Sequence, residues 1–244
     1  MPQESVVRPC NSVEEVRDGV GTQGEQQPVV LFDLCGTLYD GNTTHDFLAF
    51  FLRRNRGRYR IWRAWVFTAK VLRRFIPRPM LHRLYLRCVG QLLVNYSREE
   101  LLEYAGIFWN QCWDNRQIRT TVELLADAKK CGSHVALISA AIDPPVIALS
   151  QKLEVGAVCS QLAYDNDGHV TGFGRDLFGR KIPYLHQYLD GLDQHGPVTV
   201  YSDNANDIEM LRKVDRGIIV QRRADSRISE APRVPTDGLE ILYI

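Results

Sequence analysis

The sequence lacks several features that would place it in a specialised class of protein. Its six cysteines, at positions 10, 35, 88, 112, 131 and 159, include no CxxC pair. This spacing indicates free thiols in a reducing compartment rather than a disulfide framework or a zinc site. No apolar run reaches the roughly 20 residues that a membrane-spanning helix needs. Residues 1–27 are polar, without the basic start and apolar stretch of a signal peptide, and predict a loose tail of a cytoplasmic protein.

Acidic residues are absent from residues 47–98, which contain twelve Arg and Lys70. Because the whole chain has a net charge of only +1, the rest of it is acidic. This imbalance favours a polyanionic partner for the segment, such as phospholipid, nucleic acid or polyphosphate. The alternative is a basic insert that packs on an acidic core.

What is present is the composition of a soluble globular protein. The chain has 244 residues, of which 45% are hydrophobic and 24% charged. A chain of this length can bury a large core, in one domain or in one domain with an insert.

Apolar runs that predict buried strands alternate with amphipathic segments that predict helices. The predicted strands are 29–32, 135–138, 198–201 and 217–220, the predicted helices are 118–130, 144–153, 181–189 and 208–214, and a hairpin turn is predicted at 165–168. This alternation implies an α/β fold with a parallel sheet and right-handed crossovers. Residues 28–45 and 118–244 would form this core, and residues 46–117 would form a helical, basic, aromatic-rich insert. Residues 221–244 contain no recognisable motif.

Polar side chains stand where three of the predicted strands end. Asp33 and Ser139 directly follow the predicted strands 29–32 and 135–138, Asp203 follows the strand 198–201 after Ser202, and Asp207 lies four residues beyond Asp203. Since the carboxyl ends of parallel strands meet at one edge of a sheet, we expect these side chains to form one site. Two carboxylates near a helix N-terminus suit Mg²⁺, which prefers oxygen ligands and keeps several waters.

Four segments in this order resemble the motifs of the haloacid dehalogenase (HAD) phosphohydrolases. They are Asp33-Leu34-Cys35-Gly36-Thr37-Leu38, Ile138-Ser139-Ala140-Ala141, Gly179-Arg180-Lys181 and Tyr201-Ser202-Asp203-Asn204-Ala205-Asn206-Asp207. Their spacing is similar to that of the phosphoserine-phosphatase-like branch, in which a helical cap lies between the first two motifs. The resemblance implies a Rossmann-like, three-layer parallel-sheet core with residues 46–117 as the cap.

The resemblance also implies phosphoryl transfer through an aspartyl phosphate. Asp33 would be the nucleophile, and Lys181 would neutralise it and the transferring group. Ser139, the backbone N–H of Ala140, and Asn204 would bind phosphate oxygens. The physics agrees, because such reactions depend mostly on positioning and on charge neutralisation.

A magnesium ion is the cofactor that the resemblance implies. Its ligands would be Asp33, Asp203 and the backbone carbonyl of Cys35. Asp207 would orient the waters on the metal or the Lys181 ammonium.

Cys35 departs from the family pattern, in which this position is the Asp that protonates the leaving group and activates water. General acid–base help of this kind is typically worth ~10²–10⁴-fold. A thiol is a weak hydrogen-bonding group with an ordinary pKa of about 8.5. The protein could be a slow phosphatase, could use a substrate whose leaving group needs no proton, or could pass the phosphoryl group elsewhere. The competing hypothesis is a binding or scaffold protein that has lost catalysis.

Residues 59–76 predict an amphipathic cap helix. The helical period places Ile61, Trp62, Trp65, Ala69, Leu72, Phe75 and Ile76 on one face and Arg60, Arg63, Lys70 and Arg74 on another. This pattern favours an interfacial helix on an anionic membrane. The alternatives are a helix packed on other cap helices and, less favoured, RNA binding.

These inferences combine into one functional prediction. We expect a Mg²⁺-dependent phosphohydrolase or phosphotransferase that acts on a phosphorylated small molecule or a lipid-linked substrate. A lipid phosphate, an isoprenoid phosphate and another activated phosphate such as an acyl phosphate are the candidates. The protein would be cytoplasmic and peripheral on the inner face of a membrane.

Overall fold

Seven strands form one sheet in the computed structural model, which describes residues 26–222 and 238–244, without the side chains of residues 78 and 79. The strands are β1 (Val29–Phe32), β2 (His134–Ile142), β3 (Gly156–Tyr164), β4 (Val170–Arg175), β5 (Val198–Ser202), β6 (Arg216–Gln221) and β7 (Glu240–Tyr243). Their order is β4-β3-β2-β1-β5-β6-β7. All neighbours are parallel except β3 and β4. The predicted α/β class with a parallel sheet is confirmed, whereas the predicted tail lies almost wholly outside the described residues.

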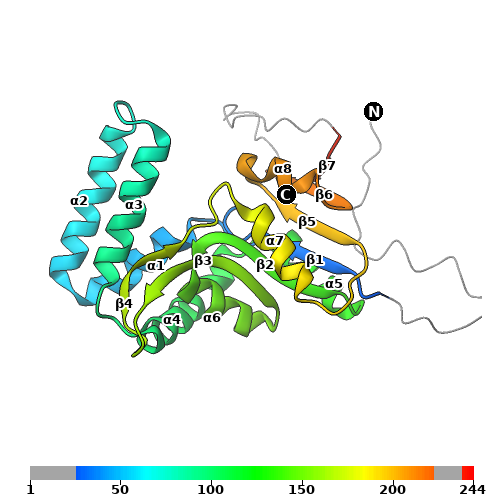
Figure 1. Ribbon diagram of the computed structural model, residues 1–244, viewed down its shortest axis with the longest axis horizontal. Coiled ribbons are helices and arrows are strands. Elements are labelled where there is room, and N and C mark those ends of the chain that lie inside the picture. Colours follow the sequence, from blue (N-terminus) through cyan, green and yellow to red (C-terminus); the bar gives the residue numbers. More distant parts are fainter. Residues whose placement is uncertain (1–25, 223–237) are drawn as a thin grey trace, which may run out of the picture.

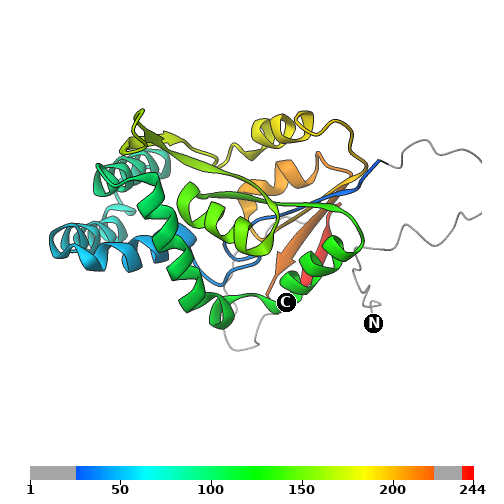
Figure 2. The ribbon, with the colours of Figure 1, turned by 90° about the horizontal axis from the view of Figure 1, so that it is seen from below.

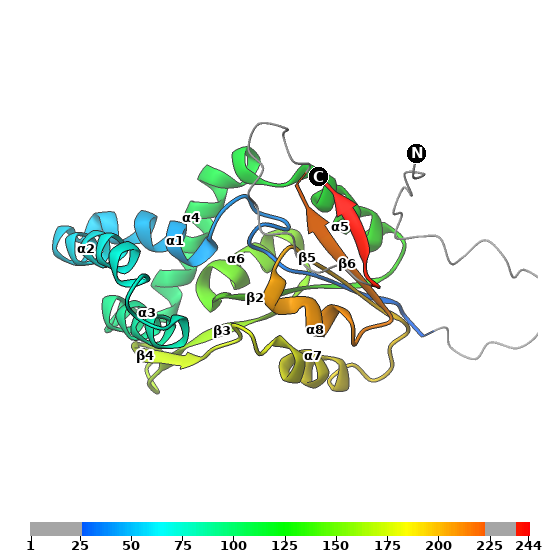
Figure 3. The same ribbon diagram turned by 90° about the horizontal axis from the view of Figure 1, so that it is seen from above.

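Helices cover both faces of this sheet, because its central strands are apolar on both sides. Val30 and Phe32 of β1 pack with α5 (Arg119–Lys130) and α6 (Asp143–Leu153). Val29 and Leu31, which point the other way, pack with α7 (Lys181–Asp190) and α8 (Ile208–Leu211). Figure 3 shows α7 and α8 on one side of the sheet and α5 on the other. This is the three-layer, Rossmann-like arrangement that was predicted.

Most of the predicted core elements are confirmed, with differences at their ends. The β3–β4 hairpin turns through Asp165–Gly168, and β2 extends beyond the predicted 135–138 to residue 142. The helix predicted at 208–214 ends at Leu211, after a 3₁₀ turn, η2 (Ala205–Asp207). Strand β7 was not predicted, since this four-residue segment becomes a strand only by pairing with β6 at the sheet edge.

The insert consists of α1 (Thr43–Phe51), η1 (Leu52–Arg54), α2 (Arg56–Leu72), α3 (Arg78–Leu93) and α4 (Arg98–Arg116). Helix α4 packs along α6, on one face of the sheet (Figure 2). Helices α2 and α3 form a hairpin that projects away from the sheet, with α3 against β4 (Figure 1). The division of the chain into domains stays a prediction. Across the described ranges, no helix is long and apolar enough to cross a membrane.

Helix α2 differs from the predicted helix 59–76 in its limits and in its buried face. It begins at Arg56, where the Asn55 side chain accepts a hydrogen bond from the Arg58 N–H. It ends at Leu72, and the chain continues through hydrogen-bonded turns to Ile76, where the following Pro77 disfavours further helix.

The predicted apolar face of α2 is split between the interior and the solvent. Trp62 is 1% exposed and lies against His45, whereas Ile61 is 58% and Phe75 is 79% exposed. The prediction of a single apolar face is therefore wrong. The physical reason is that α1 and α3 cover only one side of α2, and the other side faces the solvent beyond the sheet.

The expectation of free thiols holds at four positions and fails at one. Cys35, Cys88, Cys112 and Cys159 are free, but Cys131 is disulfide-bonded. Cys131 lies on the surface directly after α5. A search for closely spaced pairs does not detect such a bond. Cys10 lies outside the described residues.

Candidate active site

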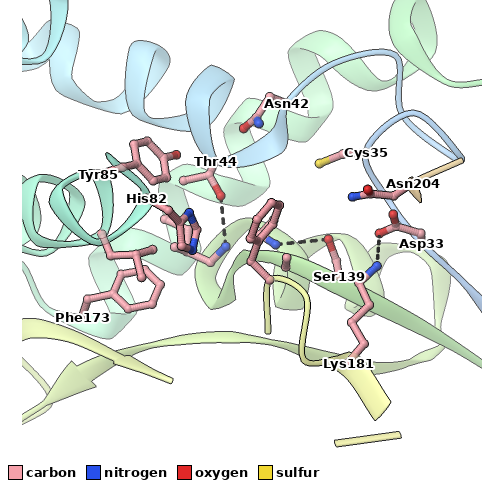
Figure 4. Close-up of a pocket in the computed structure, with 15 residues that line it drawn as sticks. Asp33, Cys35, Asn42, Thr44, His82, Tyr85, Ser139, Phe173, Lys181 and Asn204 are labelled. Carbon is pink, nitrogen blue, oxygen red and sulfur yellow. Dashed lines mark hydrogen bonds and ion pairs between the residues drawn. The ribbon is translucent and has the colours of Figure 1, made fainter. Parts of the chain in front are cut away.

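The three strand ends singled out in the sequence converge on one edge of the sheet. Strands β2, β1 and β5 are consecutive and parallel, with Phe32 paired to Leu137 on one side and to Tyr201 on the other. Asp33, Ser139 and Asp203 follow directly or within two residues. Figure 4 shows Asp33, Ser139 and Lys181 pointing toward one another. The predicted convergence is confirmed.

A buried ion-pair network forms the centre of this site. The Nζ of Lys181 lies 3.0 Å from Asp33 Oδ1 and 2.6 Å from Asp207 Oδ2. All three residues are at most 3% exposed. Ser202 Oγ also donates to Asp207 Oδ2, at 2.7 Å. Because Lys181 is the first residue of α7, the start of this helix sets the position of the ammonium.

Burial and charge act in opposite directions on this network. Burial raises the pKa of Asp33, and the attraction of Lys181 offsets only part of this. Burial by itself would lower the pKa of Lys181, but Asp33 and Asp207 outweigh it, so the pKa of Lys181 is raised. Lys181 therefore stays an ammonium, the form that can neutralise an anionic substrate.

The loop after β1 is hydrogen-bonded to the loop after β5. Thr37 Oγ1 donates to Asp203 Oδ1 at 3.1 Å and accepts from the Asp203 backbone N–H at 3.0 Å. Gly36 has a φ of +79°, and a Cβ at this position would overlap the Asp203 carboxylate. The close approach of the two loops therefore requires glycine here.

The donor set fits a magnesium ion. Burial, and after it the nearby charge of Asp33, raises the pKa of Asp203 to about 6. Within the described part of the chain, no group of three or more His, Cys, Asp or Glu side chains could hold a metal. Mg²⁺ needs fewer, since it commonly binds one or two carboxylates and keeps its waters. Asp33 and Asp203, with the Cys35 carbonyl, are compatible with such a site.

The Cys35 side chain is tied to the start of α1. Its Sγ donates to Thr43 Oγ1 at 3.2 Å and accepts from the Thr43 N–H at 3.3 Å. Burial, followed by the charge of Asp33, raises the pKa of Cys35 to about 11. The residue is thus a neutral, hydrogen-bonded thiol, which is not a proton acceptor at neutral pH.

The predicted phosphate-binding groups line the same cavity. Ser139 is 1% exposed and its Oγ accepts from the Ala141 N–H at 3.2 Å. Asn204 Oδ1 accepts from the Asn206 N–H at 3.0 Å, which leaves its amide nitrogen as a donor. Ala140 and Asn204 both line the cavity next to Asp33 and Lys181.

This cavity has a volume of about 190 Å³ and extends from the sheet edge beside Asp33 to the first half of α3. His82 Nε2 lies 2.8 Å from Asp176 Oδ2, and the His82 ring centroid lies 4.6 Å from that of Phe178. The remaining walls of the cavity are formed by Asn42, Thr44, Tyr85, Leu86, Ala141, Ile142 and Phe173. Sequence reasoning missed these walls, because side chains brought together by packing carry no motif.

A known protein family matches most of this chain. The model of the haloacid dehalogenase-like hydrolases matches residues 30–212. The chain belongs to this HAD family. The predicted family resemblance is confirmed, and so is the prediction of an enzyme of the hydrolase type. No curated protein has a significantly similar sequence.

Solved structures share the HAD fold with this chain at low sequence identity. A protein of unknown function from Bordetella pertussis Tohama I is 20% identical, with a TM-score of 0.71 over 89% of this chain and 98% of its own. Cytosolic 5'-nucleotidase IIIB bound to cytidine is 15% identical, with a TM-score of 0.60 over 80% and 73%. A phospho-aspartyl intermediate analogue of phosphoserine phosphatase is 18% identical, with a TM-score of 0.50 over 80% and 87%. At these identities the similarity shows the fold alone.

Proposed function

We propose that the protein is a Mg²⁺-dependent phosphatase or phosphotransferase that works through an aspartyl phosphate on Asp33. The observation that carries this proposal is the buried Lys181 ammonium, held between Asp33 and Asp207 at 3.0 and 2.6 Å. A carboxylate beside a buried cation, at an edge where a cavity opens, suits attack on a phosphoryl group. Phosphoserine phosphatase, which shares this fold, has been solved as a phospho-aspartyl intermediate analogue, and this supports the same chemistry here.

Each residue then has a defined role. An Asp33 oxygen forms the bond to phosphorus while the bond from phosphorus to the leaving oxygen breaks. The Ser139 hydroxyl, the Ala140 N–H and the Asn204 amide bind phosphoryl oxygens, and Lys181 neutralises the charge on them. Asp207 positions Lys181 as its 2.6 Å partner. Fixed donors and cations of this kind stabilise the charge that develops in the transition state.

Asp33, Asp203 and the Cys35 carbonyl would hold Mg²⁺. When bound, this ion would neutralise phosphate charge beside the nucleophile. It would also relieve the repulsion between the carboxylates of Asp33 and Asp203.

Cys35 makes substrates with good leaving groups the better candidates. It offers no carboxylate to protonate the leaving oxygen, and its Sγ is bonded to Thr43. An acyl phosphate or a diphosphate releases a stable anion and needs no such proton. We therefore expect fast formation of the phosphoenzyme from these substrates and slow attack of water on it.

The cavity indicates the size and charge of the leaving group. Its volume of about 190 Å³ is below the roughly 300–1,000 Å³ that is common for ligand sites. Apart from Asp33 and Lys181, the described residues that line the cavity include no Asp, Glu, Lys or Arg side chain, and His82 is bonded to Asp176. A small substrate, whose part beyond the phosphoryl group carries no charge before it is released, as in an acyl phosphate, therefore fits better than a bulky lipid. Lipid and isoprenoid phosphates stay proposals, as do a cytoplasmic location and contact of residues 59–76 with a membrane.

The test is labelling with ³²P-acetyl phosphate and Mg²⁺. We expect acid-stable label on Asp33, and Asp33→Asn should reduce labelling and phosphate release by more than about 10³-fold, because the nucleophile is lost. Asp127→Asn, at an exposed position on α5, is the matched control and should keep both activities.

The competing proposal is a scaffold protein with this fold, favoured by the replacement of the usual carboxylate with Cys35. The same experiment separates the two. If acyl phosphates, diphosphates and monoesters all give neither label nor inorganic phosphate, the scaffold proposal stands and the enzyme proposal falls.

A further inference from the structure

The hairpin of α2 and α3 exposes an apolar side that nothing covers in the described part of the chain. Five of the eight exposed large apolar side chains among the described residues lie here, at 50–79% exposure. They are Ile61, Phe67, Val71, Phe75 and Met80. The first three lie on the outward side of α2, and the last two lie at the turn into α3. This outward surface is distinct from the inner face that holds Trp62.

A cleft borders this surface between α1 and α2. It has a volume of about 280 Å³, and its cationic walls are Arg63 and Lys70, with His45 at its side. Arg63 and Lys70 are seven residues apart, two helical turns, so they lie on the same side of α2. Neither forms an ion pair with any described residue. Phe67 lines both the cleft and the outward surface.

The charge of the hairpin restricts the partner. Residues 47–98 contain no carboxylate to balance twelve Arg and Lys70. A second copy of this hairpin would be repelled by like charge. A nucleic acid would satisfy the cations, but its phosphates would leave Ile61, Val71 and Phe75 without an apolar environment. An anionic bilayer accommodates both the cationic and the apolar side chains. The apolar side chains enter the boundary of the acyl chains, while Lys and Arg contact the phosphates.

We propose that the outward side of the α2–α3 hairpin docks on an anionic lipid bilayer, with one headgroup phosphate in the cleft between α1 and α2. The hairpin projects from the sheet, so a flat surface can reach it without contacting the core (Figure 1). The active-site cavity is lined by His82, Tyr85 and Leu86, which lie in the first half of α3, within two helical turns of Met80. Docking is independent of the proposed chemistry and would hold for the scaffold alternative as well.

Vesicle sedimentation with the whole chain tests this proposal. We expect the protein to bind vesicles that contain phosphatidylglycerol at least about tenfold more tightly than vesicles of phosphatidylcholine alone. High salt should weaken the binding, because it screens exposed charges. Equal binding to both kinds of vesicle, or binding to neither, would overturn the proposal.

Paired variants locate the surface. Phe67→Ser with Phe75→Ser should weaken vesicle binding by about tenfold or more, since two large apolar side chains no longer enter the interface. Ile107→Ser on α4, also an exposed apolar position, is the control and should bind like the parent. Thermal unfolding of all the variants checks that they are folded. If the double variant binds as tightly as the control, the outward surface is not the docking side.

A second pair of substitutions tests the cleft between α1 and α2. Arg63→Gln with Lys70→Gln should reduce binding to anionic vesicles by about tenfold. Glycerol phosphate, the soluble form of the headgroup, should compete only weakly, because it lacks the acyl chains. Full competition by glycerol phosphate would assign the cleft to a free phosphate and overturn docking. RNA binding or self-association that the Phe67 and Phe75 variant abolishes, without vesicle binding, would assign the surface to that partner instead.

Discussion

Charge is arranged in opposite ways at the sheet edge that holds Asp33 and Lys181 and on the α2–α3 hairpin. At the edge, Lys181 is 3% exposed and is paired with two carboxylates. On the hairpin, Arg63 and Lys70 are exposed and have no carboxylate partner among the described residues. The edge organises charge inside the protein, where each group must be compensated. The hairpin leaves its charge available to an external partner.

The two regions also differ in what holds their apolar residues. Strand β1 is buried on both faces, so every one of its side chains contributes to the core. Helix α2 is packed on one side only, and Trp62 is its one fully buried side chain. Changes at the edge should therefore affect folding and chemistry together, whereas changes on the outward side of the hairpin should affect neither.

The strongest test of this contrast removes the buried cation. Lys181→Met should lower the free energy of unfolding by about 3–5 kcal/mol, because it leaves the Asp33 and Asp207 carboxylates buried without their partner. Urea denaturation measures this loss. Lys213→Met, which breaks the exposed pair with Glu209, is the control and should cost less than about 1 kcal/mol. Equal losses of unfolding free energy in the two variants would contradict the idea that the buried Lys181 matters more to stability than an exposed ion pair.

The second test compares the two sides of α2. Trp62→Ala should cost about 3–5 kcal/mol, since it opens a cavity between α2, α1 and α3. Phe67→Ala, at a position that is 72% exposed, should change stability by less than about 0.5 kcal/mol. Thermal and chemical unfolding of both variants provide the measurement. A large loss in Phe67→Ala would mean that the outward surface is already packed within the protein.

A third test concerns the loop contact at the edge. Gly36→Ala and Gly168→Ala both place a side chain at a φ of +79°, which costs about 1–2 kcal/mol. Only at Gly36 does the new Cβ also overlap Asp203, which adds about 1–3 kcal/mol of overpacking. We expect Gly36→Ala to be the less stable and to lose phosphate release, and Gly168→Ala to keep it. Loss of activity in both would show that the turn, not Asp203, is responsible.

The smallest expected effect is the most specific to this chain. Cys35→Asp should raise hydrolysis of a simple phosphomonoester by about tenfold or more, since it restores a proton-transfer group beside Asp33. Cys35→Ser, which has no carboxylate, should not. Phosphate release by both variants is compared with the parent. No increase would mean that the cavity, and not residue 35, limits the rate.

Much of the fold was predictable because local pattern and tertiary packing agree there. The apolar runs ending at Asp33, Ser139 and Asp203 are short, continuous and flanked by loops, so a parallel strand is their natural state. The limits of α2 were less predictable, because Asn55 and Pro77 compete with the apolar period. Strand β7 has no such run, and it forms only against β6.

The candidate site at the sheet edge was predictable for the same reason, since motif residues lie directly at the ends of strands. The cavity walls were not. His82 comes from α3 and Asp176 from the segment before α7, and they meet 94 residues apart in sequence. Such a pair depends on how the insert closes over the core, which no local pattern records.

The α/β class, the order of the motifs, the candidate nucleophile Asp33 and the uncompensated charge of residues 47–98 could all be read from the amino-acid sequence. Each of these depends on residue type and on short-range spacing. Four other features depend on how distant segments pack. They are the size of the cavity, the pairing of Cys35 with Thr43, the bonded state of Cys131 and the outward side of α2. A helical period shows that apolar residues share a face, but packing decides which face is buried.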